Sequence, residues 1–221
     1  MKNPLALLAG ILLVPALMFS QETLKLGINA GATYSSIRGN AVADRSEGAV
    51  NFLIGTSLEY PLTEKLSVLA NLNFERKSFT NTIYFETLGN FDPVVDPAFM
   101  TGSFKARGTL NYITLPVNLK YYLGAKKAFY INGGPYAGFF ISETNKVDGN
   151  KVTDDSDTFK TIDFGVNLGI GTRIAINEKS DLNIELRDCL GLTNISKVPV
   201  IDNGTVKTNS LALVVGWQFG L

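Results

Sequence analysis

From Leu24 to the C-terminus, apolar residues recur at every second position in eight separate segments. This is the period of a β-strand, in which successive side chains point to opposite faces. The clearest segment runs from Ile162 to Ile176, where Ile, Phe, Val and Leu alternate with Asp, Asn, Gly and Arg. The other segments cover residues 24–34, 50–60, 66–74, 113–121, 129–141, 182–190 and 211–221. The pattern predicts an antiparallel all-β protein.

The connections between these segments alternate in length. Tight turns are expected at residues 61–65, 124–128 and 177–181, and long loops at residues 38–49, 77–108, 142–160 and 194–207. Short turns at one end and long loops at the other are typical of a transmembrane β-barrel, with the turns in the periplasm and the loops outside the cell. We therefore predict an eight-stranded antiparallel up-and-down transmembrane β-barrel over residues 21–221.

One face of every predicted strand is apolar, whereas the other is small and polar. Eight strands closed on themselves leave an interior just wide enough for side chains. The inward set includes four cations and four anions, namely Lys25, Lys120, Arg173, Arg187, Glu59, Glu75, Asp163 and Glu185. Equal numbers of the two signs predict ion pairs and a plugged lumen. No helix pattern follows Gly165, Gly169 and Gly171, so these glycines indicate crowding in the lumen and not a phosphate loop.

Three residues fit a membrane barrel less well. Pro116 and Pro135 lie inside predicted strands, where a proline removes a ladder hydrogen bond, so we expect each to mark a bulge. Asp188 falls on the lipid-facing side of its strand, where a carboxylate is costly unless it lies near a rim. These residues leave a soluble lipocalin-like barrel open as an alternative.

The first residues have the pattern of an export signal. Lys2 precedes a 15-residue apolar run from Leu5 to Phe19, after which the chain turns polar. A membrane-spanning helix needs about 20 residues. We therefore predict a signal peptide over residues 1–20, cleaved near Ser20, with an uncleaved anchor as the alternative. No Cys follows the run, which excludes a lipidated N-terminus, and the expected location is the outer membrane of a Gram-negative bacterium.

The composition excludes several chemistries. The chain has no His and a single Cys, Cys189, so it cannot form a catalytic site with an imidazole base or an internal disulfide. A carboxylate-only site at Glu59, Glu75, Asp163 or Glu185 is conceivable, but each is better explained as a paired lumen charge. Lys and Arg total 20, as do Asp and Glu, so no basic excess indicates nucleic acid. We predict no enzymatic activity, no catalytic residue and no cofactor.

Two of the long loops hold candidate binding residues. The loop at residues 142–160 carries four carboxylates of the kind that bind calcium, Asp148, Asp154, Asp155 and Asp157, but without the spacing of an EF-hand, so we predict no metal site. The loop at residues 77–108 carries the aromatic residues Phe79, Tyr84, Phe85, Phe91, Phe99 and Phe104. Such aromatic residues either bind a partner or form a hairpin that extends two strands above the membrane.

Several short motifs together carry a family resemblance. They are Tyr112 to Val117 with Lys120 to Tyr122, Gly133 to Gly138, Asp163 to Gly171 and Gly191 to Ile195. With these motifs the chain resembles the PorT-like outer-membrane β-barrel family of Bacteroidota. The resemblance implies a small outer-membrane barrel and accounts for the two strand prolines. The named member of the family is linked to type IX secretion and gliding. The C-terminal residues 216–221 are similar to the signal read by the barrel-assembly machinery, although Val214 replaces the usual polar residue.

These interpretations lead to one expected function and one alternative. We expect a non-enzymatic integral outer-membrane protein with a structural or interaction role in the cell envelope, and the resemblance implies a link to a secretion system. The alternative is a narrow channel for small solutes or ions. The expected partners are membrane lipid and lipopolysaccharide around the barrel, the barrel-assembly machinery during insertion, and an envelope or secretion-system protein. No nucleic-acid partner is expected.

Overall fold

The structure is a computed structural model of the 221-residue chain, and it describes residues 23–86, 101–152 and 158–221. The elements in these ranges are β1 (Lys25–Arg38), β2 (Glu47–Pro61), β3 (Leu66–Glu86), β4 (Thr101–Leu123), β5 (Phe129–Val147), β6 (Asn150–Lys151), β7 (Ile162–Asn177), β8 (Ser180–Gly191), η4 (Ile201–Asn203) and β9 (Lys207–Gly220). No helix in these three ranges has the length and apolar character needed to cross a membrane. The predicted signal peptide at residues 1–20 and its cleavage site lie outside the described residues.

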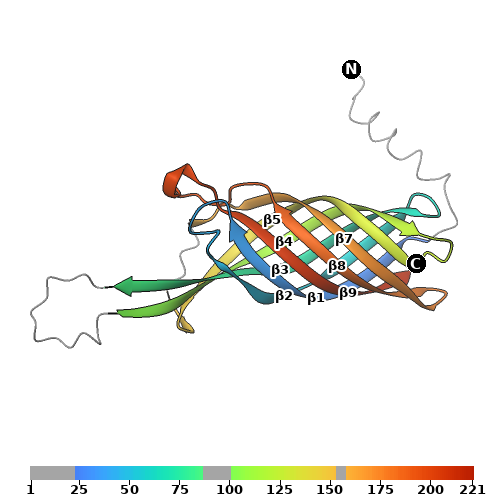
Figure 1. Cartoon of the computed structure of the whole chain (residues 1–221). Helices are drawn as coiled ribbons and strands as arrows, with labels where there is room; N and C mark the ends of the chain where they lie inside the picture. Colours follow the sequence, from blue (N-terminus) through green and yellow to red (C-terminus); the bar gives the residue numbers. More distant parts are fainter. Residues whose placement is uncertain (1–22, 87–100, 153–157) are drawn as a thin grey trace, which may run out of the picture.

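The strands form one closed antiparallel ring (Figure 1). Strand β6 has two residues and pairs only with β5, so of the nine strands in the sheet eight remain to build the ring. Each of the eight pairs with the strands before and after it in the chain, and β9 pairs with β1 to complete the circle. An open edge would leave backbone groups without partners in lipid, and closure removes it. The predicted eight-stranded up-and-down barrel is confirmed.

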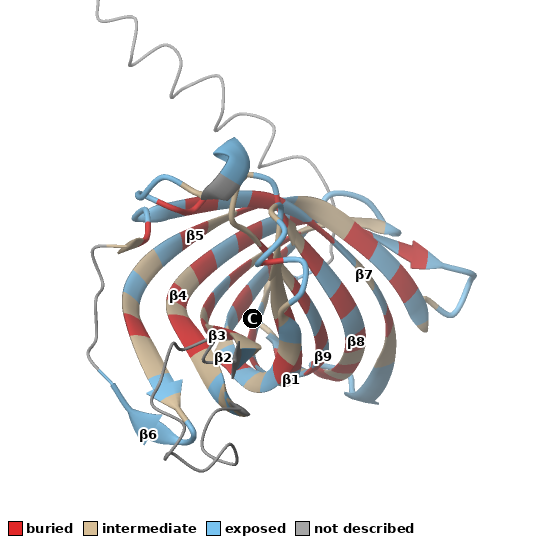
Figure 2. Ribbon diagram, turned by 60° about the vertical axis from the view of Figure 1, so that its left-hand side comes forward, coloured by how far each residue is buried: buried red, intermediate tan, exposed pale blue. Residues whose placement is uncertain are grey.

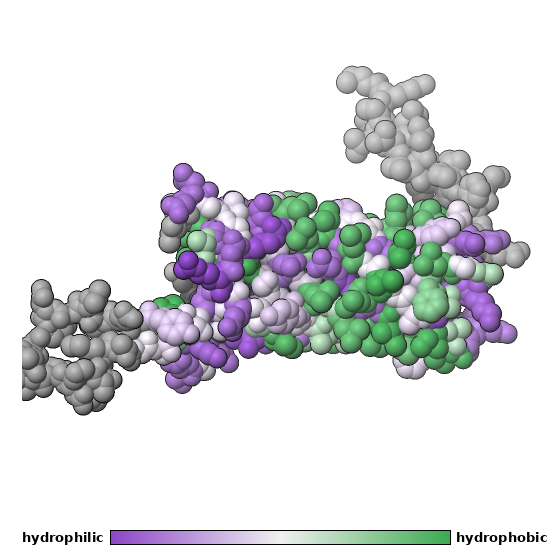
Figure 3. Space-filling view, in the orientation of Figure 1, coloured by the Kyte–Doolittle hydropathy of each residue, from purple (hydrophilic) through white to green (hydrophobic). Residues whose placement is uncertain are grey.

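Burial alternates along the strands of the ring, as the stripes in Figure 2 show. On β7, Leu168 is 69% exposed and the adjacent Asn167 only 1%. Apolar side chains cover much of the barrel wall, and hydrophilic ones gather at the end that carries the long β3–β4 hairpin (Figure 3). A soluble lipocalin-like barrel would hide its apolar face inside, so the orientation seen here is that of a membrane barrel.

Short turns join the strands at one end of the ring, where they were predicted. Residues 62–65 connect β2 to β3, residues 124–128 connect β4 to β5, and residues 178–179 connect β7 to β8. Gly124 has a φ of 71°, a conformation that favours glycine. The C-terminal end of the ring lies at the same end, because the Leu221 amide donates to the Leu24 carbonyl at 2.9 Å.

Strands β3 and β4 project far beyond the others at the opposite end (Figure 1). They pair with each other, without a shift of register, as far as Glu86 and Thr101. The pairing of β3 with β2 ends at Thr80, and that of β4 with β5 ends at Ala106, so the outer part is a free-standing hairpin. The predicted loop at residues 77–108 is therefore wrong over most of its length, and the alternative of an extending hairpin is correct.

Two other predicted loops are also shorter than expected. Strand β2 begins at Glu47, inside the predicted loop at residues 38–49. Strand β5 continues to Val147, inside the predicted loop at residues 142–160. On β5 the outward residues Thr144 and Lys146 are polar while the backbone pairing continues, so hydropathy alone places that loop boundary too early.

Pro116 and Pro135 do not mark bulges. The β4–β5 pairs run to Pro116↔Tyr136 and resume at Leu119↔Gly133 in the same register. The ladder is interrupted for two residues on β4 but gains no extra residue. The shifts of register lie elsewhere, in β2, in β5 and next to the β7–β8 turn. The expectation of bulges at these prolines is therefore wrong.

Candidate functional site

The inward side chains fill the lumen with polar and charged groups that solvent does not reach. Lys120 is 1% exposed, Glu59 2% and Asp163 0%. A buried charge is costly unless it is paired and hydrogen-bonded. The partners of these charges therefore decide whether the lumen is a sealed interior or a hydrated passage. Three clusters contain them, described here from the turn end toward the hairpin end.

The Glu59 cluster joins β2, β4 and β9 near the turns. Lys120 Nζ lies 2.9 Å from Glu59 Oε2. The Tyr122 hydroxyl donates to Glu59 Oε1 at 2.7 Å, and Gln218 Nε2 donates to Oε2 at 3.1 Å. The ammonium of Lys120 also lies 4.1 Å from the centroid of the Tyr130 ring, a cation–π distance. The carboxylate and the ammonium are thus both satisfied within the protein.

A second cluster surrounds Glu185 on β8. Arg187 Nε lies 2.6 Å from Glu185 Oε1. The Tyr130 hydroxyl and Asn132 Nδ2 donate to Glu185 Oε2 at 3.0 and 2.7 Å. Tyr130 therefore belongs to both clusters, because its hydroxyl binds Glu185 while its ring faces Lys120.

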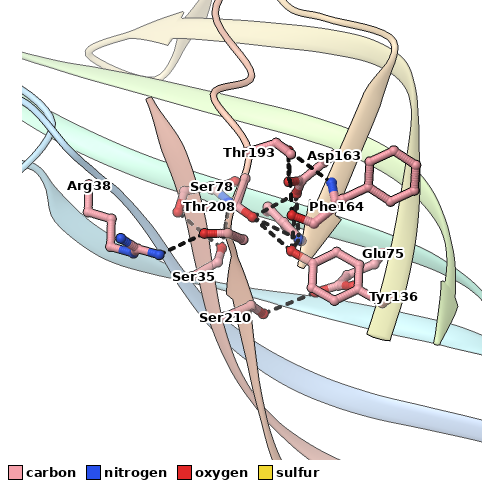
Figure 4. Close-up of polar contacts among 12 residues, drawn as sticks. Ser35, Arg38, Glu75, Ser78, Tyr136, Asp163, Phe164, Thr193, Thr208 and Ser210 are labelled. Atoms are coloured by element: carbon pink, nitrogen blue, oxygen red, sulfur yellow. Dashed lines mark hydrogen bonds and ion pairs between the residues drawn. The ribbon is translucent and has the colours of Figure 1, made fainter. Parts of the chain in front are cut away.

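The third cluster collects four donors around Asp163 of β7 (Figure 4). Asp163 Oδ2 accepts from the Thr208 hydroxyl at 2.8 Å, the Tyr136 hydroxyl at 3.2 Å and Lys77 Nζ at 3.4 Å. The Thr193 hydroxyl approaches Oδ1 at 3.3 Å. Because these residues come from β3, β5, β9 and the β8–β9 connection, the carboxylate ties four parts of the ring together.

An apolar cluster closes the lumen beyond Asp163. Leu110 and Tyr112 point inward from β4, and Phe159 and Ile195 pack onto them from the connections before β7 and after β8. The Lys160 amide donates to the Ile195 carbonyl at 2.7 Å and joins the two connections. The four side chains are at most 7% exposed. Loop residues thus fold into the ring as a cap.

Glycines make room for the large lumen side chains. A Cβ atom on Gly171 would collide with the Tyr130 ring and lie 2.8 Å from the Ile184 carbonyl oxygen. A Cβ atom on Gly165 would collide with the Tyr136 ring. This is the crowding predicted for these glycines. The cavity left among the Glu59 and Glu185 clusters measures about 30 Å³, which is room for one or two waters and not for a passage.

The eight predicted lumen charges face inward, but the four cations do not simply pair with the four anions. Glu59 pairs with Lys120, and Glu185 pairs with Arg187, so these four residues form ion pairs within the predicted set. Lys25 instead pairs at 2.6 Å with an aspartate that was assigned to a turn, Asp181. Asp163 pairs with Lys77, which was assigned to a loop, and the other two predicted charges rely on neutral partners.

Arg173 and Glu75 are the two that make no ion pair in the described part of the chain. The guanidinium of Arg173 lies 5.0 Å from the centroid of the Tyr122 ring. Glu75 Oε1 accepts from the Ser210 hydroxyl at 3.0 Å. An aromatic face and a hydroxyl replace the opposite charge in these positions.

The sequence analysis missed several lumen residues, including the charged residues Lys77 and Asp181. Both lay within predicted connections. A signal for each was present, because Lys77 continues the inward series Asn73 and Glu75, and Asp181 precedes Asn183 by two residues. Extending the period of 2 past the apolar residues would have found them.

Of the four aspartates in the predicted loop at residues 142–160, the structure describes one. Asp148 Oδ1 accepts from the Lys105 amide at 2.9 Å, and Asp154, Asp155 and Asp157 lie outside the described residues. Within the ranges that the structure describes, no three His, Cys, Asp or Glu side chains are placed to hold a metal ion.

The aromatic residues of the β3–β4 hairpin divide between its base and its outer part. Phe79 packs against the apolar cap. Tyr84 is 79% exposed. Phe91 and Phe99 lie outside the described residues, as does the side chain of Phe85. Because Phe79 packs into the cap, the six aromatic residues do not share one exposed binding surface.

Asp188 points outward from β8, on the side predicted for it. Its register partners are Leu168 on β7 and Leu211 on β9, which are 69% and 45% exposed. The predicted outward side of Asp188 is confirmed. Cys189, the next residue, is a free buried thiol on the lumen side.

Comparisons with known proteins bear on the family of the chain. A family profile described as "Outer membrane protein beta-barrel domain" matches residues 19–197. Among solved structures, Neisserial surface protein A is 15% identical over 89% of this chain and 97% of its own, with a TM-score of 0.46. The outer membrane protein OprG from Pseudomonas aeruginosa is 14% identical over 90% of this chain and 98% of its own, with a TM-score of 0.46. No curated protein matches the chain significantly.

Proposed function

We propose that this chain, which belongs to the outer membrane protein beta-barrel domain family, is a sealed and non-enzymatic barrel of the outer membrane with an interaction role at the cell surface. The observation that carries the proposal is the lumen, where the paired charges and tyrosines are almost fully buried and the cavity beside Lys120 and Glu185 measures about 30 Å³. A barrel whose interior is packed in this way offers solutes no passage. Its functional surface is then the part that projects outside the membrane.

The β3–β4 hairpin is the element that best supports an interaction role. Beyond Thr80 and Ala106 its two strands pair, as strands, only with each other, so the hairpin stands apart from the rest of the ring. Tyr84 and Ile83 on this part of the hairpin are 79% and 43% exposed. A projecting hairpin with exposed apolar side chains is suited to binding another protein.

We extend the proposal to the PorT-like branch of Bacteroidota, with a signal peptide at residues 1–20. Its partners would be lipopolysaccharide around the barrel, the barrel-assembly machinery and an envelope or secretion-system protein. The support is the set of motifs in β4, β5 and β7. These motifs contain Tyr112, Tyr136 and Asp163, which build the lumen and the cap, so they explain a shared sealed interior more directly than a shared partner.

The sealed lumen predicts that the purified protein does not conduct ions. Reconstituted in a planar bilayer at the protein density that gives frequent steps for a porin in the same membrane, it should give none. The porin serves as the positive control for insertion and recording. Reproducible conductance steps of uniform size would reject the sealed barrel and favour the alternative of a narrow channel.

The interaction role predicts that a photo-crosslinker at Tyr84 captures an envelope protein in intact cells. The same crosslinker at Leu168, on the lipid-facing wall, is the matched control and should give no protein adduct. Adducts are counted as discrete higher bands and identified by mass spectrometry. Equal labelling patterns at the two positions, or none at Tyr84, would count against the hairpin as the contact surface.

A further inference from the structure

A hollow opens in the outer wall of the ring toward the hairpin end, where β2 and β3 stop pairing. Strand β2 pairs with β3 at Leu53 and again at Gly48, with a shift of register between them. A side chain of β1 binds the freed β3 backbone, because the Ser35 hydroxyl accepts from the Ser78 amide at 2.6 Å and donates to its carbonyl at 3.1 Å. The separated strands border a hollow of about 650 Å³.

Four cations line this basic hollow, and they come from three strands. They are Arg76 of β3, Lys105 and Arg107 of β4, and Lys146 of β5, and the single carboxylate in the lining is Glu47. None of the four cations makes an ion pair with a residue that the structure describes. Like charges held around one space repel each other, so a bound anion would relieve a cost that Glu47 alone offsets only in part.

Hydrogen-bond donors are also held in the hollow. Arg107 Nη2 donates to the Val50 carbonyl at 2.9 Å, which fixes its guanidinium across the space between β4 and β2. Arg76 Nε and Asn51 Nδ2 are buried donors without an acceptor among the described residues. Buried donors in folded proteins nearly always have an acceptor. The charge and the donors thus point to the same kind of ligand, an anion with several oxygen atoms.

The hollow begins directly above the apolar wall of the barrel. The guanidinium carbon of Arg76 lies 5.7 Å from the centroid of the Phe52 ring. Phe52 is 45% exposed on the outer face and contacts Phe74, with 6.2 Å between the ring centroids. Apolar side chains below and cations immediately above match a lipid, whose acyl chains lie below its charged headgroup.

We propose that the basic hollow binds the phosphate groups of a phosphorylated lipid headgroup in the outer leaflet of the membrane. An arginine guanidinium matches phosphate oxygens with two parallel hydrogen bonds, and 650 Å³ is within the size of a small-molecule site. The acyl chains run down the wall past Phe52. The choice of lipopolysaccharide as the source of the phosphate rests on the proposed function, which names it as a partner. The site itself does not depend on whether the lumen is sealed.

The test is a titration of the full folded chain in detergent micelles with phosphorylated lipopolysaccharide, in which native mass spectrometry counts the bound molecules. The variant R76Q/K105Q/K146Q should bind about tenfold more weakly or worse, since each lost charge-assisted contact is worth a large part of that factor. The control K65Q/K126Q/K179Q removes the same number of exposed charges at the turn end and should bind as the wild type does. Equal affinity of the first variant and the wild type would overturn the proposal.

Two further arms identify the source of the phosphate. Dephosphorylated lipopolysaccharide should bind the wild type as weakly as it binds the variant, and inorganic phosphate at millimolar concentration should not displace the intact lipid. Displacement by inorganic phosphate would assign the hollow to a soluble anion and reject the lipid. If the triple variant does not fold, K105Q/K146Q replaces it, because these two side chains make no hydrogen bond with the described residues. If the lipid does not bind the hollow, the proposed function still stands or falls by the conductance and crosslinking experiments.

Discussion

The Glu59→Leu variant unfolds with a free energy about 3–5 kcal/mol below that of the wild type, as is usual when one member of a buried ion pair is removed. The substitution leaves Lys120, which is 1% exposed, without the carboxylate that lies 2.9 Å away. The ammonium keeps its desolvation cost and loses its partner. Denaturant titration of the protein in lipid vesicles measures the change, with Trp217, the one tryptophan of the chain, as the fluorescent reporter.

A double variant separates charge from packing. Glu59→Leu with Lys120→Met removes both charges and should recover at least half of the lost free energy, because apolar pairs often replace buried ion pairs without a net cost. Glu64→Leu, on the exposed β2–β3 turn, is the surface control and should change stability by less than about 0.5 kcal/mol. A double variant as unstable as Glu59→Leu alone would mean that lost packing, and not the unpaired ammonium, causes the effect.

At the third cluster the two partners should differ in what their loss costs. Asp163→Leu leaves the Lys77 ammonium and three hydroxyls without their shared acceptor, so we expect a loss of about 3–5 kcal/mol. Lys77→Met leaves a carboxylate that still accepts from Thr208, Tyr136 and Thr193, at 2.8, 3.2 and 3.3 Å. Its cost should be about half as large, because three donors remain. The same vesicle titration compares the two variants.

Asp163→Asn is the graded control for this comparison. It keeps one acceptor oxygen for the hydroxyls but no charge for Lys77, so its stability should fall between those of the other two variants. Glu178→Leu, on the exposed β7–β8 turn, controls for removing a carboxylate as such. If Lys77→Met costs as much as Asp163→Leu, the hydroxyls do not satisfy the carboxylate, and the view of Asp163 as the centre of the cluster is wrong.

Most of the barrel could be predicted because lipid and lumen impose opposite demands on neighbouring residues. On β7 the alternation runs unbroken from Ile162 to Ile170, which sets the strand and the inward side of Asp163 together. The same alternation gave the correct outward side for Asp188 and the correct inward side for Glu59. The turns followed from the polar residues between successive strands.

The full length of the strands could not be predicted from the alternation of hydropathy. Above the apolar wall, outward positions such as Arg76 and Arg107 are polar, so the alternation of hydropathy fades while the backbone pairing of β3 and β4 continues. The prolines misled for a related reason, since a short gap in a ladder need not insert a residue. Hydropathy reports the surroundings of a strand and not its hydrogen bonds.

The pairs in the lumen were also beyond the sequence. Alternation places Lys25 inside but does not reveal that its partner is Asp181, 156 residues away in the chain. Which inward residues face each other across the ring depends on the stagger of the strands. The basic hollow between β2 and β3 depends on a local shift in that stagger, and no sequence motif predicts such a shift.

The distances along the chain between lumen partners bear on how such a barrel is assembled. Glu59 and Gln218 are 159 residues apart, and Glu75 and Ser210 are 135 residues apart. A sheet made of β1 to β4 alone already carries Glu59, Lys120 and Lys77 but lacks the last strands that complete their surroundings. Its inner face must therefore remain hydrated during insertion. We therefore expect water to leave the inner face only when β9 arrives, so that until then the nascent sheet has one hydrated polar face and one apolar face.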